Sequence, residues 1–166
     1  MNKSMHLSEH YTLGEVTKTS VKTTDGRSAT QGDALLAKNI PSHVAIENLK
    51  NLCENWLEDL RYSHNTLYGE KDEPIIITSG YRSAEVNKAV GGSPTSNHLT
   101  GCAVDIRCAG FEQALRYANI LLDISDDTKQ DYDELFIERS KQGRYWIHFA
   151  VRPKGNRRKT EFIFIR

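Results

Sequence analysis

Apolar residues recur at spacings of three and four along two segments of the chain, a period typical of amphipathic helices. The first predicted helix begins near Pro41, which suits a first helical turn, and extends toward Tyr62. Its apolar face consists of Ile46, Leu49, Leu52, Cys53, Trp56 and Leu60. A second helix is expected to be closed by the acidic segment SDD at 125–127; its apolar face consists of Phe111, Ala114, Leu115, Ala118, Leu121 and Leu122. A short helix between the two is predicted from Ser83, a favoured N-cap residue, through Val90.

Strand patterns occupy one segment in the middle of the chain and much of its last third. An unbroken β-branched run at 74–78, bounded by proline and glycine, predicts a buried strand, and 102–108 is a second extended segment. Three further strands are predicted at 134–139, 145–151 and 160–165, the first two joined by a short loop that contains Gly143. Helices early in the chain and strands late favour an α+β fold with a small, mostly antiparallel sheet packed with helices.

Length, charge and hydropathy limit the possible partners. The 166 residues fit a single domain, expected to span 1–166 with a polar N-terminal arm at 1–40 and a core at 41–166. Lys and Arg number 22, as do Asp and Glu, so the net charge of zero gives no reason to expect nucleic acid or an anionic membrane as a partner. No apolar run resembles a signal peptide or a membrane span, so synthesis in the cytoplasm is expected, and we expect a monomer. The three cysteines lack CxxC spacing and are expected to be reduced and buried.

Alternation of side chains along two predicted strands places candidate ligands away from the core. In YWIHFAV, the apolar Ile, Phe and Val share one face, which leaves His148 on the other face together with Trp146. In CAVDIR, the same alternation separates Asp105 from the Cys, Val and Ile of the core face. We therefore expect both His148 and Asp105 to point toward a cleft or toward solvent.

His98, Asp105 and His148 together make a set of two nitrogen ligands and one oxygen ligand. Such a set suits a catalytic zinc ion with a fourth position open for water. The first two belong to the segment SNHLTGCAVD, whose small residues leave room beside the carboxylate. The spacing alone also fits a histidine that caps a turn, and an aspartate that pairs with Arg82 or Arg107.

Longer motifs in the chain resemble those of the M15 family of zinc peptidases, the D-alanyl-D-alanine carboxypeptidase and dipeptidase group, and in particular its phage-lysin-like branch, subfamily A. That family carries an SxHxxGxAxD pattern and a later WxH, which read here as SNHLTGCAVD and WIH. The strings YTLGEV, NIP, SGYRS, VN and VGG are also similar to that branch, so the resemblance extends from about residue 10 to residue 151. It implies the zinc-peptidase architecture that these carboxypeptidases share with hedgehog-like domains.

The resemblance also implies roles for individual residues. The zinc ligands would be His98, Asp105 and His148. Arg82, the arginine of SGYR, would bind the substrate carbonyl and stabilise the oxyanion, a role that suits the fixed charge and forked donors of a guanidinium. Ser96 would hold the terminal carboxylate or the neighbouring peptide of the substrate, although it also fits a serine that caps a turn. Tyr81 and Trp146 would line a pocket for a peptide side chain, or simply pack.

The general base departs from the family pattern. Several M15 members place an acidic residue or a histidine three positions before the last ligand, where this chain has Tyr145, whose ordinary pKa of about 10 makes it a poor base. Glu138 is the expected base instead, because it lies on the non-core face of its strand. Pairing of that strand with 145–151 would bring it close to His148. Lysin-like relatives carry a similar acidic residue before WxH; the alternative is a solvent-facing glutamate at the end of a hairpin.

The implied function is zinc-dependent hydrolysis of peptidoglycan stem peptides, and we expect a D-Ala-D-Ala carboxypeptidase. The alternatives are an endopeptidase of the endolysin type, which would cut the L-Ala-D-Glu bond or cross-links, and a non-catalytic cell wall binding or phage structural module. Because the substrate lies outside the membrane, we expect the protein to reach the cell wall by phage-type release. The basic segment 152–159 is either a solvated turn or is attracted to an anionic wall polymer.

Overall fold

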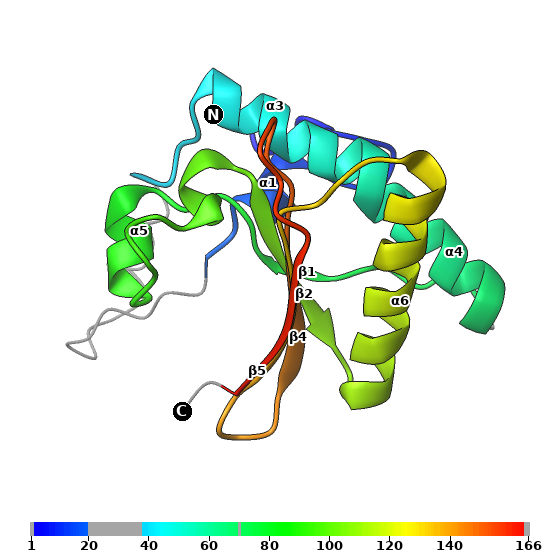
Figure 1. Ribbon diagram of the computed structural model, residues 1–166. Coiled ribbons are helices and arrows are strands. Elements are labelled where there is room, and N and C mark those ends of the chain that lie inside the picture. The colour runs from blue at the N-terminus through cyan, green and yellow to red at the C-terminus, as the bar shows by residue number, and fades with distance from the viewer. Residues whose placement is uncertain (1, 20–37, 70, 165–166) are drawn as a thin grey trace.

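The computed structural model describes residues 2–19, 38–69 and 71–164 (Figure 1). Its helices are α1 (Leu13–Val16), α3 (His43–Leu52), η1 (Cys53–Leu57), α4 (Glu58–Tyr68), α5 (Ala84–Ala89), η2 (Asn97–Thr100) and α6 (Phe111–Thr128). Its strands are β1 (Ile77–Ser79), β2 (Ala103–Cys108), β3 (Glu134–Arg139), β4 (Tyr145–Ala150) and β5 (Lys159–Phe164). They form one sheet in the order β1-β2-β4-β3-β5, in which β3 and β5 are parallel and the other neighbours antiparallel. The predicted α+β class with a mostly antiparallel sheet is confirmed.

The two faces of the sheet have different environments. Figure 1 shows α6 on one side of the sheet and α5 on the other. The side chains of Val104, Leu135, Ile147 and Phe149 are fully buried, and the ring of Phe149 lies 5.0 Å from that of Trp56 in η1, measured between centroids. Alternation of side chains therefore turns the intervening polar residues of β2, β3 and β4 toward the opposite face.

The helices differ from the predicted ones at their ends. Pro41 precedes the N-cap of α3, which is Ser42, and the helical run continues through the π-helical η1 to Tyr68, beyond the expected Tyr62. Helix α6 ends at Thr128, directly after the SDD segment at 125–127 that was expected to close it. Asp126 in this last turn pairs with Arg158 of the segment before β5, at 2.9 Å, a contact that is not visible in local periodicity.

The predicted strand at 74–78 is wrong in extent and burial. Strand β1 covers only Ile77–Ser79, lies at an edge of the sheet and pairs with β2 through an irregular register. Ile75 and Ile77 are buried, whereas 36% of Ile76 is exposed. An edge strand with one face on the core buries alternate residues, so the unbroken apolar run gave a misleading indication of a strand buried on both faces.

The described part of the N-terminal segment, residues 2–19, is attached to the core. Leu7, Tyr11, Leu13 and Val16 are almost fully buried and belong to the main hydrophobic cluster. The carboxylate of Glu58 in α4 accepts hydrogen bonds from the Ser8 hydroxyl at 2.6 Å and from the backbone N–H of His10 at 2.8 Å. Residues 20–37 of the predicted polar arm lie outside the described residues.

Two further expectations concern membrane and redox chemistry. In the ranges that the structure describes, no helix is long and apolar enough to cross a bilayer. All three cysteines are free and buried, as predicted, and burial raises the pKa of the Cys108 thiol to about 12. These cysteines are therefore packing residues.

Candidate metal centre

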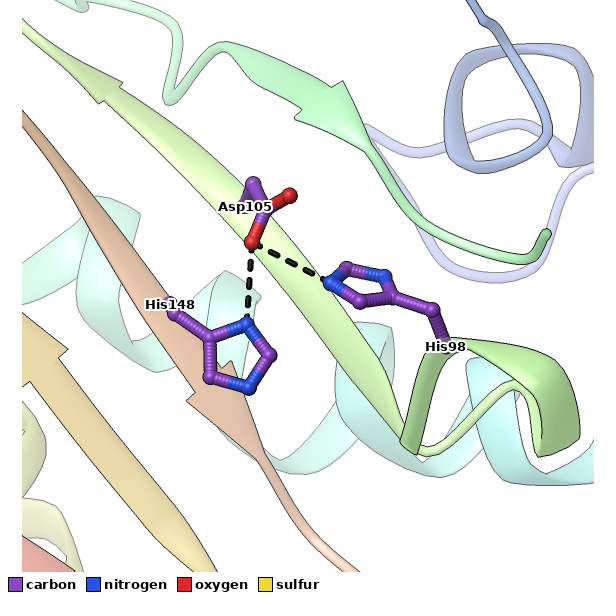
Figure 2. Close-up of side chains that lie close together, drawn as sticks. All are labelled: His98, Asp105 and His148. Carbon is purple, nitrogen blue, oxygen red and sulfur yellow. Dashed lines mark hydrogen bonds and ion pairs between the residues drawn. The ribbon is translucent and has the colours of Figure 1, made fainter. Parts of the chain in front are cut away.

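Three side chains from three elements converge on one point of the non-core face of the sheet. His98 comes from η2, Asp105 from β2 and His148 from β4, and Figure 2 shows both imidazole rings directed at the same carboxylate oxygen. Oδ1 of Asp105 is 3.2 Å from Nε2 of His98 and 3.0 Å from Nδ1 of His148. One ligand atom from each residue lies within 4.8 Å of the others, so the cluster can hold a metal ion.

Local geometry fixes His98 in this position. Ser96 is the N-cap of η2 and its hydroxyl accepts a hydrogen bond from the backbone N–H of His98, while Gly101 ends η2 in the left-handed region at φ +72°. The His98 ring is 2% exposed, and its Nδ1 donates to the carbonyl of Gly80 at 2.6 Å. A carbonyl can only accept, so the proton of a neutral His98 lies on Nδ1 and the lone pair of Nε2 faces the centre.

His148 has an equivalent arrangement with its nitrogens exchanged. It lies directly opposite Asp105 in the β2–β4 pair, and Phe136 of β3 stacks on its ring at 5.5 Å between centroids. Nε2 of His148 donates to Oε2 of Glu134 at 3.2 Å. In a neutral His148 the carboxylate of Glu134 therefore holds the proton on Nε2, and the lone pair of Nδ1 faces the centre.

These donors fit a tetrahedral zinc ion. When both histidines are neutral, two imidazole lone pairs and a carboxylate oxygen meet with no proton between them, which is unfavourable unless a positive charge lies there. Ligand atoms placed about 2.0–2.1 Å from a tetrahedral ion lie roughly 3.3 Å from one another, close to the two distances measured from Asp105. The second nitrogen of each histidine donates to an oxygen outside the set, as is usual for metal-binding histidines.

The electrostatics also favour a cation at this point. Burial works to raise the pKa of Asp105, but His98 and His148 hold it far below its usual range. Burial works to lower the pKa of His148, but hydrogen bonds to Asp105 and Glu134 outweigh it and raise the pKa to about 9. The carboxylates of Asp105 and Glu134 create a negative potential at the nearly buried His148, and this potential stabilises positive charge, whether it is a proton or a metal ion.

Arg82 holds the other oxygen of the central carboxylate. Its Nη2 donates to Oδ2 of Asp105 at 2.5 Å and its Nε donates to the Ser79 hydroxyl at 2.9 Å. The backbone N–H of Arg82 also donates to the carbonyl of His98 at 3.0 Å. The sequence left open whether Asp105 pairs with Arg82 or binds a metal ion. The structure allows both, because Arg82 contacts Oδ2 of Asp105 and the two histidines face Oδ1.

A pocket of about 530 Å³ opens onto the cluster, and the predicted base Glu138 lines it. Glu138 lies opposite Trp146 in the β3–β4 pair, which confirms the predicted pairing of these strands. Burial raises the pKa of Glu138, although His148 partly offsets this, and Trp146 forms a hydrogen bond to the carboxylate that also works to lower it. A raised pKa suits a carboxylate that accepts and releases a proton near neutral pH.

The remaining predicted residues divide into two groups. Ser96 and Trp146 line the pocket together with Glu138. Tyr81 does not line it: the ring is partly buried against the hydrophobic core, and the backbone of Tyr81 bonds to Val16 and Asn39. Tyr145, the residue that occupies the usual position of the base, lines a different pocket and contacts the ring of Phe111.

Four residues around the cluster were not predicted as site residues: Asn97, Asp133, Glu134 and Arg157. Glu134 is the acceptor for His148, and hydrogen bonds from His148 lower its pKa to about 2 against desolvation. Strand alternation could have identified it, since Glu134 shares a face with Glu138. No pattern in the sequence indicates Arg157.

The basic segment 152–159 is largely neutralised within the molecule. Arg157 pairs with Asp133 and Glu134, Arg158 with Asp126 and Asp131, and Lys159 with Glu161. These contacts favour the interpretation of this segment as a structural turn over one in which it attracts an anionic polymer.

The sequence matches the model of a known protein family. A family model described as Peptidase M15 matches residues 9–124, which include His98 and Asp105. The matched range ends before β3 and β4, so it does not include His148, Glu134 or Glu138. The structure places these three residues at the cluster. A search of curated proteins finds no match.

Proposed function

The chain belongs to peptidase family M15, and from this premise we propose that it is a zinc-dependent peptidase that cleaves the stem peptides of peptidoglycan. The observation that supports this most strongly is the convergence of His98, Asp105 and His148, with the outer nitrogen of each histidine held by an oxygen acceptor. These three residues would hold the ion. Bound zinc would polarise the scissile carbonyl and lower the pKa of a water molecule beside it.

Glu138 is the general base in this proposal. It would accept a proton from the attacking water and pass that proton to the leaving amine. Its place in the lining of the pocket, its raised pKa and the hydrogen bond from Trp146 support the assignment. Trp146 would orient the carboxylate toward the substrate, and the buried environment would maintain its basicity.

Arg82 has two tasks in this proposal. Its contact with Oδ2 of Asp105 orients the carboxylate so that Oδ1 faces the two histidines. In the described part of the chain its Nη1 makes no hydrogen bond, so this nitrogen is free to donate to the oxyanion that forms on the substrate carbonyl. Ser96, which lines the same pocket, would bind a neighbouring peptide group or the terminal carboxylate.

The leading substrate is a stem peptide that ends in D-Ala-D-Ala, from which the last residue would be released. One observation favours the alternative, an endopeptidase that cuts within stem peptides or cross-links. Among the described residues that line the pocket, Arg82 is the only permanent cation, and it is already paired with Asp105. A carboxypeptidase has to bind a free terminal carboxylate, whereas an endopeptidase binds a neutral chain on both sides of the bond.

A digest of defined muropeptides tests the proposal and separates the two activities. The zinc-loaded protein is incubated with a pentapeptide stem and, separately, with cross-linked dimers, and the products are identified by mass spectrometry. Release of D-alanine from the stem supports the carboxypeptidase, and internal cleavage supports the endopeptidase. Either product should disappear with a chelator and in Glu138→Gln. If zinc is bound but neither substrate is cut, the peptidoglycan proposal is wrong and a binding role is favoured.

A further inference from the structure

A chain of polar contacts extends from His148 away from the pocket to the surface of the molecule. Oε2 of Glu134 accepts from Nε2 of His148, and Oε1 of Glu134 accepts from Nη2 of Arg157 at 2.5 Å. Arg157 lies between β4 and β5, and 50% of its side chain is exposed, compared with 12% for His148. The acceptor of a candidate metal ligand is therefore held by a residue that lies outside the pocket.

The neighbouring Asp133 fixes this arginine. The side chain of Asp133 is fully buried, its Oδ1 accepts from Nε of Arg157 and its Oδ2 accepts from Nη2, both at 2.8 Å. This paired geometry matches the forked donors of a guanidinium and holds its plane. The second hydrogen of Nη2 then points at Glu134, so the orientation of Arg157 determines the position of the Glu134 carboxylate.

Asn97 closes the network on the side of the other histidine. Its Nδ2 donates to Oδ2 of Asp133 at 2.8 Å and to Oε2 of Glu134 at 2.9 Å. Asn97 directly precedes His98 in η2. The side chains of Asn97, Asp133, Glu134 and Arg157 thus link η2, which carries His98, to β3, whose Glu134 accepts from His148. The two contacts of Asn97 use both hydrogens of its amide.

We propose that Arg157 is a positioning residue for the metal centre. By holding Glu134 it keeps the acceptor in place for His148, which fixes the ring orientation and the tautomer that presents Nδ1 to the ion. Without Arg157, Glu134 keeps its contacts with Asn97 and His148 but loses the charged partner of Oε1, so the acceptor of the Nε2–H of His148 is held less firmly. The inference rests on the proposed function, because it concerns a ligand of the proposed ion.

The test compares Arg157→Gln with Arg158→Gln, its neighbour in the same segment. Arg158 also pairs with two carboxylates, Asp126 and Asp131, but neither belongs to the cluster. Zinc affinity is measured by competition with a chelating dye, and the Co²⁺-substituted proteins are compared by their visible absorption spectra. We expect Arg157→Gln to weaken zinc binding about tenfold or more and to change the Co²⁺ spectrum, as other losses of such outer partners do. Arg158→Gln should leave both unchanged.

The outcomes separate this inference from the proposed function. If the wild-type chain binds neither Zn²⁺ nor Co²⁺, both are overturned. If the wild type binds and Arg157→Gln binds equally well with the same spectrum, only the inference is overturned. Should Arg157→Gln fail to fold, Arg157→Lys provides the same decision, because an ammonium group keeps the positive charge but lacks the forked donors that pair with Asp133 and Glu134. Weaker binding then supports the inference, and unchanged binding overturns it.

Discussion

Asp105 and His148 lie opposite each other on β2 and β4, with 3.0 Å between Oδ1 of the carboxylate and Nδ1 of the imidazole. The residues are 43 positions apart in the chain, and the strand register brings them together. Opposite residues of an antiparallel pair point to the same face, so the pairing itself sets this contact. A slip of one residue would turn His148 toward the core and remove it from the cluster.

The first prediction concerns the three candidate ligands. Replacing His98, Asp105 or His148 by alanine should abolish tight zinc binding, because each removes one of three converging lone pairs. Elemental analysis of the purified variants measures this directly. His43→Ala is the control, since His43 is exposed at the start of α3. Undiminished zinc content in any of the three variants would remove that residue from the ligand set.

The second prediction separates the two candidate bases. Glu138→Gln should retain zinc and lose about 10²–10⁴-fold in turnover, because an amide cannot accept the proton of water. Tyr145→Phe should retain turnover, because Tyr145 lines a different pocket from Glu138. Rates on the same muropeptide compare them. A fully active Glu138→Gln would mean that the base lies elsewhere.

The third prediction concerns Arg82. Arg82→Ala should lower both zinc affinity and turnover, since one guanidinium orients Asp105 and faces the pocket. Arg107→Ala is a suitable control: Arg107 lies two residues after Asp105 on β2 but forms no ion pair within the described residues. Titration with zinc and steady-state rates give the two readouts. Normal zinc affinity combined with lost turnover would assign Arg82 to the substrate alone.

The fourth prediction concerns the turn that follows His98. Gly101 has φ +72°, and a Cβ there would lie 2.3 Å from the carbonyl oxygen of Ala45. Gly91 has φ +71° with open space around it, so Gly91→Ala measures backbone strain alone, about 1–2 kcal/mol. Gly101→Ala should reduce the free energy of unfolding by more than this. Urea unfolding of both variants is the measurement, and equal losses would show that Ala45 moves aside.

The fifth prediction is a pH dependence at the N-terminal segment. Burial works to raise the pKa of Glu58, but hydrogen bonds from Ser8 and His10 outweigh it and lower the pKa below 4.5. Between the folded and the unfolded pKa of Glu58, the unfolded chain therefore binds more protons than the folded chain. These contacts stabilise the fold fully above about pH 4.5, and the stabilisation is lost as the pH falls through the pKa of Glu58 in the folded protein.

The corresponding measurement is urea unfolding of wild type and Glu58→Gln at several pH values. The variant should be less stable than wild type at pH 7, and the difference should shrink under acidic conditions. Glu47→Gln, at an exposed position of α3, serves as the control and should show no such trend. A difference that stays constant with pH would mean that the charge of Glu58 is not what attaches the segment.

Local patterns predicted the strands β2, β3 and β4 well, because one face of each is buried. The strand faces that turn Asp105 and His148 away from the core are confirmed, as is the N-cap at Ser83. An error occurs at 74–78, where the place of β1 at the edge of the sheet decides which residues are buried.

The sequence by itself determined the α+β class, the three residues that can hold a metal ion and the face on which two of them lie, because alternation and motif spacing are properties of the local chain. Only the tertiary structure decided that Glu134 holds His148 and that Arg157 holds Glu134. It also decided that Tyr81 lies against the core instead of in the pocket. These relations depend on strand order and on side chains that meet across long separations, which no periodicity within a segment records.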